Sequence, residues 1–253
     1  MITENIKSIG IELEGGINSD DLKKLKNFVK ENSLNDYFSY GYDYSVNVEN
    51  KDYYNIEIRF WHYDLNIFFK FIEYVFNECR FKQNDSCGNH IHLKFIDNEK
   101  ALSVFSYRKS WKMFLDEYKK YAFSFSDEKT MNKYLSRLQN RYCLAKYNTK
   151  IVISQIRSYE KNESRYRAIN LNSYNLNKTI EIRILPYFST FTEAKKSIEW
   201  LIKTIDKIYN IRKSMMKKFS IDLNVENNGN FYYTIKRDNI KDLNMKIKIM
   251  KIE

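Results

Sequence analysis

Polar and apolar residues alternate in short segments along the chain, and this pattern predicts β-strands. Alternation sends successive side chains to opposite faces of a strand. The segments that show it are 9–15, 40–48, 53–61, 90–96, 166–172 and 179–185, with two more at 230–236 and 245–252. The turn-like sequence SYNLNK at 173–178 lies between two of them, so we expect a hairpin there, with Pro186 ending its second strand.

Apolar residues spaced three and four positions apart predict helices between these strands. The predicted helices cover residues 20–32, 64–79, 98–122, 127–145 and 190–218. We expect Ser19 to cap the first helix and Asp64 to begin the second, because both side chains accept hydrogen bonds from free backbone N–H groups. Strands, then helices, then strands again predict an α+β fold with an antiparallel sheet.

The same pattern predicts how the chain is divided. We interpret residues 1–218 as one domain and residues 219–253 as a C-terminal tail with a small β extension. No internal repeat and no linker rich in glycine, serine or proline interrupts the first region. With 253 residues and a hydrophobic fraction of 43%, the chain is long and apolar enough to bury a core.

Composition also bears on the compartment. No apolar run reaches the roughly 18 to 20 residues needed to cross a bilayer, so we expect no membrane partner. The first residues, MITENIKSIG, lack the basic and apolar segments of a secretory signal. Cys79, Cys87 and Cys143 are odd in number and form no CxxC pair, which favours reduced thiols and a cytoplasmic location.

The net charge of +11 favours anionic partners, such as nucleotide phosphates, nucleic acid or an acidic substrate. The lysines are nevertheless spread along the chain, as on solvated helix faces. The 21 tyrosines are scattered as well, rather than arranged as a base-stacking motif. Nucleic-acid binding is therefore an open alternative that the sequence does not favour.

Four of the predicted strands contain a polar–apolar–polar triplet. The triplets are Glu12-Leu13-Glu14, Glu57-Ile58-Arg59, His90-Ile91-His92 and Glu181-Ile182-Arg183. In each triplet the two polar side chains share one face of the strand, and the aliphatic side chain points to the other face. If the strands belong to one sheet, the aliphatic face packs on helices and the opposite face displays carboxylates, imidazoles and guanidinium groups together.

Each triplet taken alone has an ordinary structural explanation. Glu-x-Arg is most often a solvated sheet face or a cross-strand ion pair, and a single His-x-His is as often structural as metal-binding. Carboxylates with an imidazole suit Mg²⁺ or Mn²⁺, and nearby arginines suit phosphate. Zinc is the alternative for Cys87, His90 and His92, but no second cluster offers a fourth ligand, so we do not favour a structural zinc site.

The ordered set of motifs resembles the amidoligases, carboxylate–amine ligases related to glutamine synthetase and glutamate–cysteine ligase. The resemblance covers about residues 8–200. It is carried by IGIELEG, DYS at 43–45 followed by NIEIRF, CGNHIHLKF, RYRAINLN at 165–172 and TIEIRIL. It implies a curved antiparallel sheet of the glutamine-synthetase type, with helices on the convex face and the site on the concave face.

The resemblance also implies roles for individual residues. It implies metal ligands at Glu12, Glu14, Glu57, His90 and Glu181. It implies contacts with the ATP phosphates at His92, Arg165, Arg167, Asn170 and Arg183. Arg183, Glu57 and Asp43 are the candidate catalytic residues, the two acids as candidates for the base that deprotonates the amine. Tyr44 and Arg59 depart from the family pattern on the presumed substrate side.

The activity that the resemblance implies is ATP- and Mg²⁺- or Mn²⁺-dependent amide-bond formation through an acyl phosphate. A carboxylate substrate and an amine substrate would be the partners, and the sequence identifies neither. A metal-dependent phosphodiesterase or nuclease is one alternative. A non-catalytic descendant, such as a viral binding or structural protein, is another, although four unpaired carboxylates are costly without ions that neutralise them.

Overall fold

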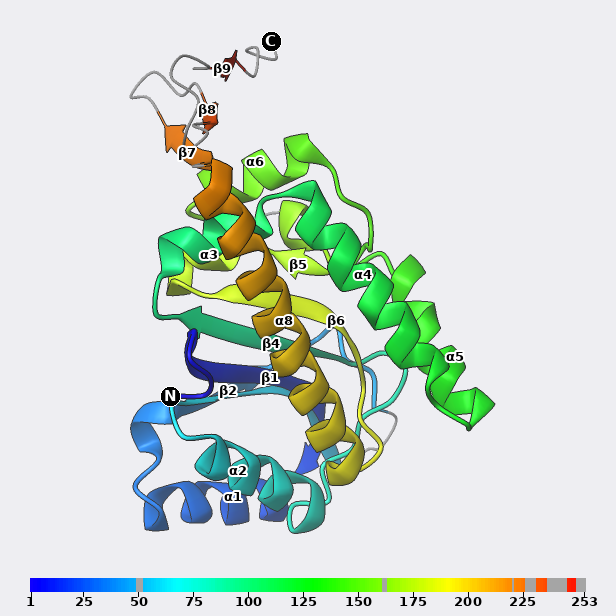
Figure 1. Ribbon diagram of the computed structural model, residues 1–253. Coiled ribbons are helices and arrows are strands. Elements are labelled where there is room, and N and C mark those ends of the chain that lie inside the picture. Colours follow the sequence, from blue (N-terminus) through cyan, green and yellow to red (C-terminus); the bar gives the residue numbers. More distant parts are fainter. Residues whose placement is uncertain (49–51, 161–162, 220, 226–230, 236–244, 249–253) are drawn as a thin grey trace.

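Six antiparallel strands form the main sheet of the computed structural model (Figure 1). The structure describes residues 1–48, 52–160, 163–219, 221–225, 231–235 and 245–248. The strands lie in the order β2-β3-β1-β4-β6-β5 across the sheet. Their bounds are β1 (Ile6–Asn18), β2 (Phe38–Tyr42), β3 (Tyr53–His62), β4 (Gly88–Phe95), β5 (Ile169–Asn170) and β6 (Ile180–Pro186).

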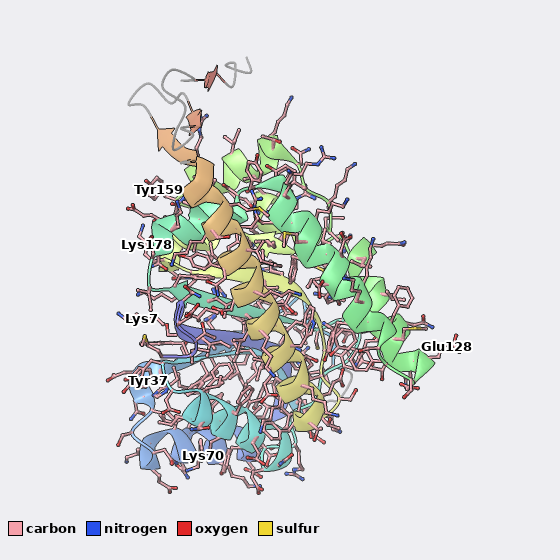
Figure 2. All side chains as sticks on the ribbon, in the orientation of Figure 1. Lys7, Tyr37, Lys70, Glu128, Tyr159 and Lys178 are labelled. Atoms are coloured by element: carbon pink, nitrogen blue, oxygen red, sulfur yellow. The ribbon has the colours of Figure 1, made fainter. Side chains whose placement is uncertain are left out.

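Helices connect most of these strands. Their bounds are α1 (Ser19–Glu31), α2 (Leu65–Asn77), α3 (Asn98–Phe105), α4 (Arg108–Phe123), α5 (Glu128–Ser136), α6 (Thr149–Arg157), α7 (Asn172–Asn177) and α8 (Phe191–Phe219). None of the helices in the described ranges is long and apolar enough to span a membrane. Charged side chains such as Lys70 on α2 and Glu128 on α5 project outward from these helices (Figure 2).

The aliphatic residue of every triplet lies in the core. These residues, which are Leu13, Ile58, Ile91 and Ile182, have no exposed surface. They belong to one buried cluster with apolar residues of α2, α3, α4 and α8, and α8 runs across this side of the sheet (Figure 1). Burial of each such side chain contributes about 1.5–3 kcal/mol. The predictions of an α+β fold, an antiparallel sheet and an aliphatic face against helices are confirmed.

The single helix predicted over 98–122 is wrong, because the structure has two helices, α3 and α4. Ser110 Oγ donates a hydrogen bond to the carbonyl of Val104 at 2.6 Å, and Trp111 Nε1 donates to the carbonyl of Phe105 at 2.7 Å. These side chains take the place of the backbone N–H groups that would have continued α3. The periodicity of the apolar residues continues through the break between the two helices. The sequence pattern therefore does not reveal this break.

The strand predicted over 40–48 ends earlier, at Tyr42. Asp43 Oδ1 accepts hydrogen bonds from the backbone N–H and the hydroxyl of Ser45, at 2.8 and 2.6 Å. These hydrogen bonds form a turn, so the pairing with the neighbouring strand ends at Tyr42. The first helix is likewise capped one residue earlier than predicted, by Asn18 rather than Ser19, because Asn18 Oδ1 accepts from the N–H of Asp21. Asp64 caps α2 as predicted.

The helix predicted over 127–145 is also too long. Helix α5 is followed by one 3-10 turn over Arg137–Gln139 and then by an irregular segment, where Asn140 Oδ1 accepts from the N–H of Tyr142 at 2.8 Å. Helix α6, which was not predicted, begins at a separate cap, Asn148. The segment between these helices thereby becomes part of the wall of the candidate site.

The hairpin prediction is confirmed in its pairing and wrong in its connection. Strand β5 pairs antiparallel with β6, but it contains two residues rather than the seven of 166–172. Most of the SYNLNK segment is helix α7 rather than a turn. Asn175 Nδ2 donates to the carbonyls of Ile156 and Ser158, at 2.6 and 2.8 Å, and so joins α7 to the end of α6.

A second, three-stranded antiparallel sheet follows α8. Its strands are β7 (Ile221–Val225), β8 (Phe231–Ile235) and β9 (Met245–Lys248). Strand β8 agrees with the prediction for 230–236 over residues 231–235, and residues 230 and 236 lie outside the described residues. Strand β9 covers the first half of the strand predicted over 245–252. Residues 249–252 of that prediction lie outside the described residues. Strand β7 was not predicted.

Candidate active site

Strand register brings the polar residues of the triplets directly opposite one another. Each triplet lies on a different strand, and β1 lies between β3 and β4. The cross-strand pairs are Glu12 with Arg59, Glu12 with His90, Glu14 with Glu57, and His92 with Glu181. Side chains that face each other across neighbouring strands lie within contact distance, so the sheet itself assembles the cluster.

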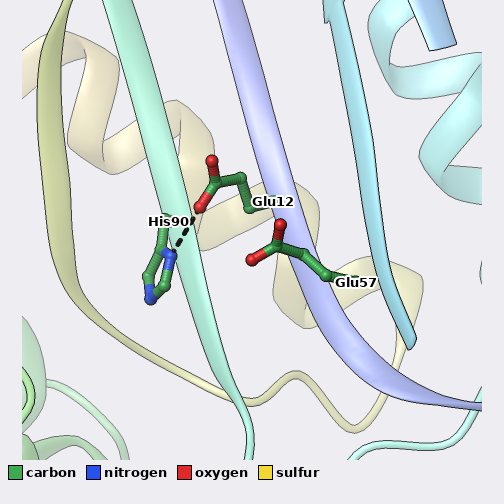
Figure 3. A group of neighbouring side chains, drawn as sticks. All are labelled: Glu12, Glu57 and His90. Carbon is green, nitrogen blue, oxygen red and sulfur yellow. Dashed lines mark hydrogen bonds and ion pairs between the residues drawn. The ribbon is translucent and has the colours of Figure 1, made fainter. Parts of the chain in front are cut away.

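His90 lies at the centre of this cluster. Its Nδ1 is 2.8 Å from Glu12 Oε2, and its Nε2 is 3.4 Å from Glu14 Oε1. Figure 3 shows His90 on β4, Glu12 on β1 and Glu57 on β3, with the three side chains converging above the sheet. Glu12 also approaches the second imidazole, because its Oε1 lies 3.2 Å from His92 Nε2. One carboxylate thus bridges both histidines.

Three groups of side chains have the composition and spacing of a metal site. In each group the donor atoms lie within 4.8 Å of one another. The groups are Glu12, Glu57 and His90; Glu12, His92 and Glu181; and Glu14, Asp43 and Glu57. They overlap at Glu12 and Glu57, as expected where neighbouring divalent ions share carboxylate ligands. The donors are oxygen and imidazole nitrogen, which fits Mg²⁺ or Mn²⁺.

The electrostatics of the cluster keep Glu12 ionised. Burial by itself raises the pKa of Glu12, but attraction to His92 and hydrogen bonds with both histidines bring that pKa well below the ordinary glutamate value. The pKa of His92 is raised in turn: burial disfavours the imidazolium, and the charges of Glu12 and Glu181 outweigh this effect. Glu12 therefore carries the negative charge that a residue needs in order to bind a cation.

The two flanking carboxylates behave differently. Burial, together with the charge of Glu12, raises the pKa of Glu57 even though Arg59 forms an ion pair with it. Burial also raises the pKa of Glu181. The charges of Arg183 and His92 together outweigh this effect, so the pKa of Glu181 is lowered. Arg183 Nη1 lies 2.6 Å from Glu181 Oε1. A bound cation would offset the charge of Glu12 at Glu57 and favour the ionised form of Glu57.

A cavity of about 560 Å³ opens above the cluster. The sheet forms its floor, and the segments after β2, before β4, after α5 and around α7 form its walls. The six carboxylates that line it are Glu12, Glu14, Asp43, Glu57, Asp85 and Glu181. The five arginines that line it are Arg59, Arg137, Arg141, Arg165 and Arg183. A cavity of this size accommodates a nucleotide-sized ligand.

Nearly all the residues singled out in the sequence lie in this cavity. Asp43, Arg165 and Asn170 line it together with the triplet residues, and Asn170 Nδ2 donates to Glu181 Oε2 at 2.6 Å. Arg167 is the exception, because it is not among the lining residues. His92, which the resemblance places beside phosphate, belongs here to one of the three candidate metal groups.

Several lining or supporting residues were not found from the sequence. Arg137 and Arg141 follow α5, in a Lys-rich region whose charges resemble an ordinary solvated face. Ser173 Oγ and Thr179 Oγ1 each lie 3.1 Å from His92 Nδ1, and Ser173 belongs to the segment interpreted as a turn. No spacing rule links these positions to the triplets, since the chain brings them together only by folding.

Cysteine takes no part in the candidate metal groups of the described residues. Cys87 is buried beside Val46 and Val48, and its thiol donates to Asn84 Oδ1 at 3.6 Å. Burial raises the pKa of Cys87, which disfavours the thiolate that zinc would require. All three cysteines are free. The geometry therefore gives no support to the zinc alternative.

No family model, no curated protein and no solved structure matches this chain.

Proposed function

We propose that the protein is an ATP- and Mg²⁺- or Mn²⁺-dependent carboxylate–amine ligase with a sheet of the glutamine-synthetase type. The observation that supports this most directly is the composition of one cavity. It combines three overlapping groups of oxygen and imidazole donors with five arginines. The resemblance of the sequence motifs to amidoligases agrees with this composition but is a separate argument.

The residues present suit divalent ions. Glu12, Glu57 and Glu181 would hold them with His90 and His92. When bound, such ions neutralise phosphate oxygens and make the terminal phosphorus easier to attack. They would also offset the repulsion from Glu12, which adds to burial in raising the pKa of Glu57.

The proposed reaction has two steps. A substrate carboxylate oxygen attacks the terminal phosphorus of ATP, the bond to the bridging oxygen breaks, and ADP leaves. The amine then attacks the acyl carbon, loses a proton, and expels inorganic phosphate. Arg183 lies beside Glu181 at the floor of the cavity, where it would stabilise the phosphoryl charge. Losing such a contact typically costs about 10²–10³ in rate.

Asp43 is the better placed of the two candidate bases. It lines the cavity near the exposed Tyr44, and its Oδ1 accepts hydrogen bonds from Ser45. Glu57 is tied to Arg59 and to two of the metal groups, so a bound cation would occupy its lone pairs. Asp43 belongs to only one of the three groups, so cations held by the other two leave its carboxylate free. We therefore assign proton removal from the amine to Asp43 and metal binding to Glu57.

Calorimetric titration with ATP, in Mg²⁺ or Mn²⁺, tests the proposal. We expect metal-dependent binding in the wild-type protein and its loss in Glu12→Gln. The matched control is Glu73→Gln, because Glu73 is exposed on α2 and belongs to no candidate metal group. Screening of amine and carboxylate pairs for ADP release then identifies the substrates.

The same experiment separates the main alternative. A metal-dependent phosphodiesterase would use the same carboxylates but would cleave bis(p-nitrophenyl) phosphate without ATP. Hydrolysis of that ester, abolished by Glu12→Gln in a protein that does not bind ATP, would replace the ligase proposal. Absence of ATP binding with either metal would contradict it outright.

A further inference from the structure

The arginines of the cavity fall into two classes. Arg59 and Arg183 form ion pairs with Glu57 and Glu181, so their charges are already balanced. The other three have no carboxylate within 4.0 Å among the residues that the structure describes. They are Arg137, Arg141 and Arg165. Three unbalanced cations on the walls of a cavity that also contains candidate metal ligands indicate a place for an anion.

Arg137 is the buried member of this set. The residue is 7% exposed, and its Nη2 donates to the carbonyl of Arg183 at 3.0 Å. Its Nε has no acceptor among the described residues. A buried N–H of a charged group without a partner is costly. The residue lines the cavity, so an anion there would be attracted to the charge of its guanidinium.

Gly88 leaves open the space in which Arg137 meets the candidate metal ligands. A Cβ at this position would lie 2.9 Å from Arg137 Nη2 and 3.5 Å from both Glu14 Oε2 and His90 Nε2. An atom above Gly88 is thus within reach of a guanidinium and of two metal-site side chains. An anion held there by Arg137 would also be able to contact a bound cation.

Tyrosines hold the other two arginines in place. The guanidinium carbon of Arg141 lies 4.7 Å from the ring centre of Tyr142, and that of Arg165 lies 5.0 Å from the ring centre of Tyr166. The two rings contact each other edge to face, with their centres 5.6 Å apart. Stacking on an aromatic ring orients a guanidinium without neutralising its charge.

With divalent cations bound, the formal charge of the lining would favour an anionic ligand. Six carboxylates and five guanidinium groups leave it at −1 with neutral histidines. Two divalent cations in the candidate metal groups would change it to +3. A ligand with several phosphoryl oxygens would balance this charge, whereas a neutral ligand would leave three arginines without partners.

We propose that Arg137, Arg141 and Arg165 form an anion subsite that binds the phosphoryl groups of a polyphosphate next to the metal ligands. The assignment of this polyphosphate to ATP rests on the proposed function, while the subsite itself rests on the geometry above. The proposed subsite adds Arg137 and Arg141 to the residues predicted from the sequence, and it does not include Arg167.

Tripolyphosphate is the probe that tests the subsite without a nucleoside or a reaction. Its dissociation constant would be measured by calorimetry in Mg²⁺ for the wild type and for Arg137→Gln, Arg141→Gln and Gly88→Ala. We expect binding to weaken about 10-fold or more in Arg137→Gln and roughly 3- to 10-fold in the exposed Arg141→Gln, since buried charged contacts contribute more than those at a rim. Gly88→Ala should also weaken it, because the added methyl group displaces Arg137 Nη2.

Arg108→Gln is the matched control, because Arg108 is exposed at the start of α4 and does not line the cavity. It removes the same charge as Arg141→Gln. If the two variants lose the same affinity for tripolyphosphate, the effect comes from net charge alone and the subsite is overturned. Arg141→Gln keeps the test valid if Arg137→Gln does not fold. Citrate is titrated in parallel: selective loss of citrate binding, with tripolyphosphate unaffected, would overturn the phosphoryl assignment in favour of a carboxylate ligand.

The two proposals fail separately. Tripolyphosphate binding that depends on Arg137 and Arg141 supports the subsite even if no amide bond is ever formed. Conversely, a protein that releases ADP with an amine and a carboxylate, but binds tripolyphosphate equally well in all variants, keeps the ligase function and loses the subsite.

Discussion

At the scale of single residues, the candidate site depends on how each imidazole is oriented. His92 Nε2 faces Glu12, and its Nδ1 faces the hydroxyls of Ser173 and Thr179, which lie 2.8 Å from each other. A histidine that binds a metal through one nitrogen donates the proton on the other to a nearby acceptor. A hydroxyl can accept a hydrogen bond from a protonated Nδ1, and the tautomer with that proton on Nδ1 leaves Nε2 free for a cation.

Removal of both hydroxyls should weaken metal binding. We expect the double variant Ser173→Ala and Thr179→Val to bind Mn²⁺ about 10- to 100-fold more weakly, which is the usual cost of losing such supporting hydrogen bonds. Electron paramagnetic resonance of free Mn²⁺ measures the affinity directly. Ser124→Ala is the control, since its exposed hydroxyl donates to the carbonyl of Tyr121, away from the cavity. Equal affinity in all three proteins would rule out the supporting role.

Asp21 on α1 is a second residue whose surroundings determine its chemistry. Its carboxylate is buried and accepts hydrogen bonds from Asn18, Lys24 and Arg80, at 2.8, 3.0 and 2.9 Å. Burial raises the pKa of Asp21, but the hydrogen bonds from Arg80 and Lys24 outweigh it, and the pKa is lowered. A lowered folded-state pKa stabilises the fold above the unfolded value of about 3.9, and this contribution disappears as the pH falls through the folded-state pKa.

Replacement of Asp21 should therefore have a pH-dependent cost. We expect Asp21→Asn to reduce the free energy of unfolding by about 1.5–3 kcal/mol at pH 7, the range for hydrogen bonds to a charged group. The difference from wild type should shrink toward pH 3, as Asp21 itself becomes protonated. Urea denaturation at both pH values measures it. Asp20→Asn is the control because Asp20 is exposed, and a cost that stayed constant with pH would contradict the assignment.

At the scale of elements, one tyrosine links the helices after β4 to the sheet. Tyr118 on α4 is fully buried, and its hydroxyl lies 2.9 Å from the carbonyl of Tyr134 on α5 and 3.1 Å from that of Ile184 on β6. Arg137 comes directly after α5. Tyr118 thus links the end of α5, which leads into Arg137, to the strand that contributes Glu181 and Arg183 to the floor of the cavity.

Loss of the Tyr118 hydroxyl should destabilise the fold modestly. We expect Tyr118→Phe to lower the free energy of unfolding by about 1–2 kcal/mol, because the hydroxyl proton that the two buried carbonyls share is lost while the ring still fills its space. Chemical denaturation is the measurement, with Tyr159→Phe as the control, since Tyr159 is exposed (Figure 2). A larger loss in the control than in Tyr118→Phe would show that the link is unimportant.

At the scale of the whole molecule, the fold gathers negative charge that bound cations would neutralise. Ligands that bind only the folded state stabilise it, by about 2.7 kcal/mol at a concentration 100 times the dissociation constant. We expect Mn²⁺ or Mg²⁺ to raise the melting temperature and a chelator to reverse the rise. Differential scanning fluorimetry of wild type and Glu12→Gln measures the effect. An equal rise in both proteins would place the stabilising ions elsewhere.

Local sequence patterns were sufficient for most of the architecture. Alternation defined the strands that form the floor of the site, because a strand with one buried face must alternate. It also predicted that Glu12, Glu57, His90 and Glu181 would share a face, and the structure places them there. Helix ends were predicted less well, since side-chain hydrogen bonds such as that from Ser110 to the Val104 carbonyl ended a helix within an unbroken apolar pattern.

The sequence by itself determined the floor of the candidate site, and only the tertiary structure decided its walls. The floor follows from the alternation of polar and apolar residues along each strand, which has a period of two residues. The walls bring Arg137, Arg141 and Ser173 against the floor across long stretches of chain, through contacts such as that between Arg137 and the Arg183 carbonyl. Contacts between residues far apart in the chain leave no local period, so they become visible only when the chain is folded.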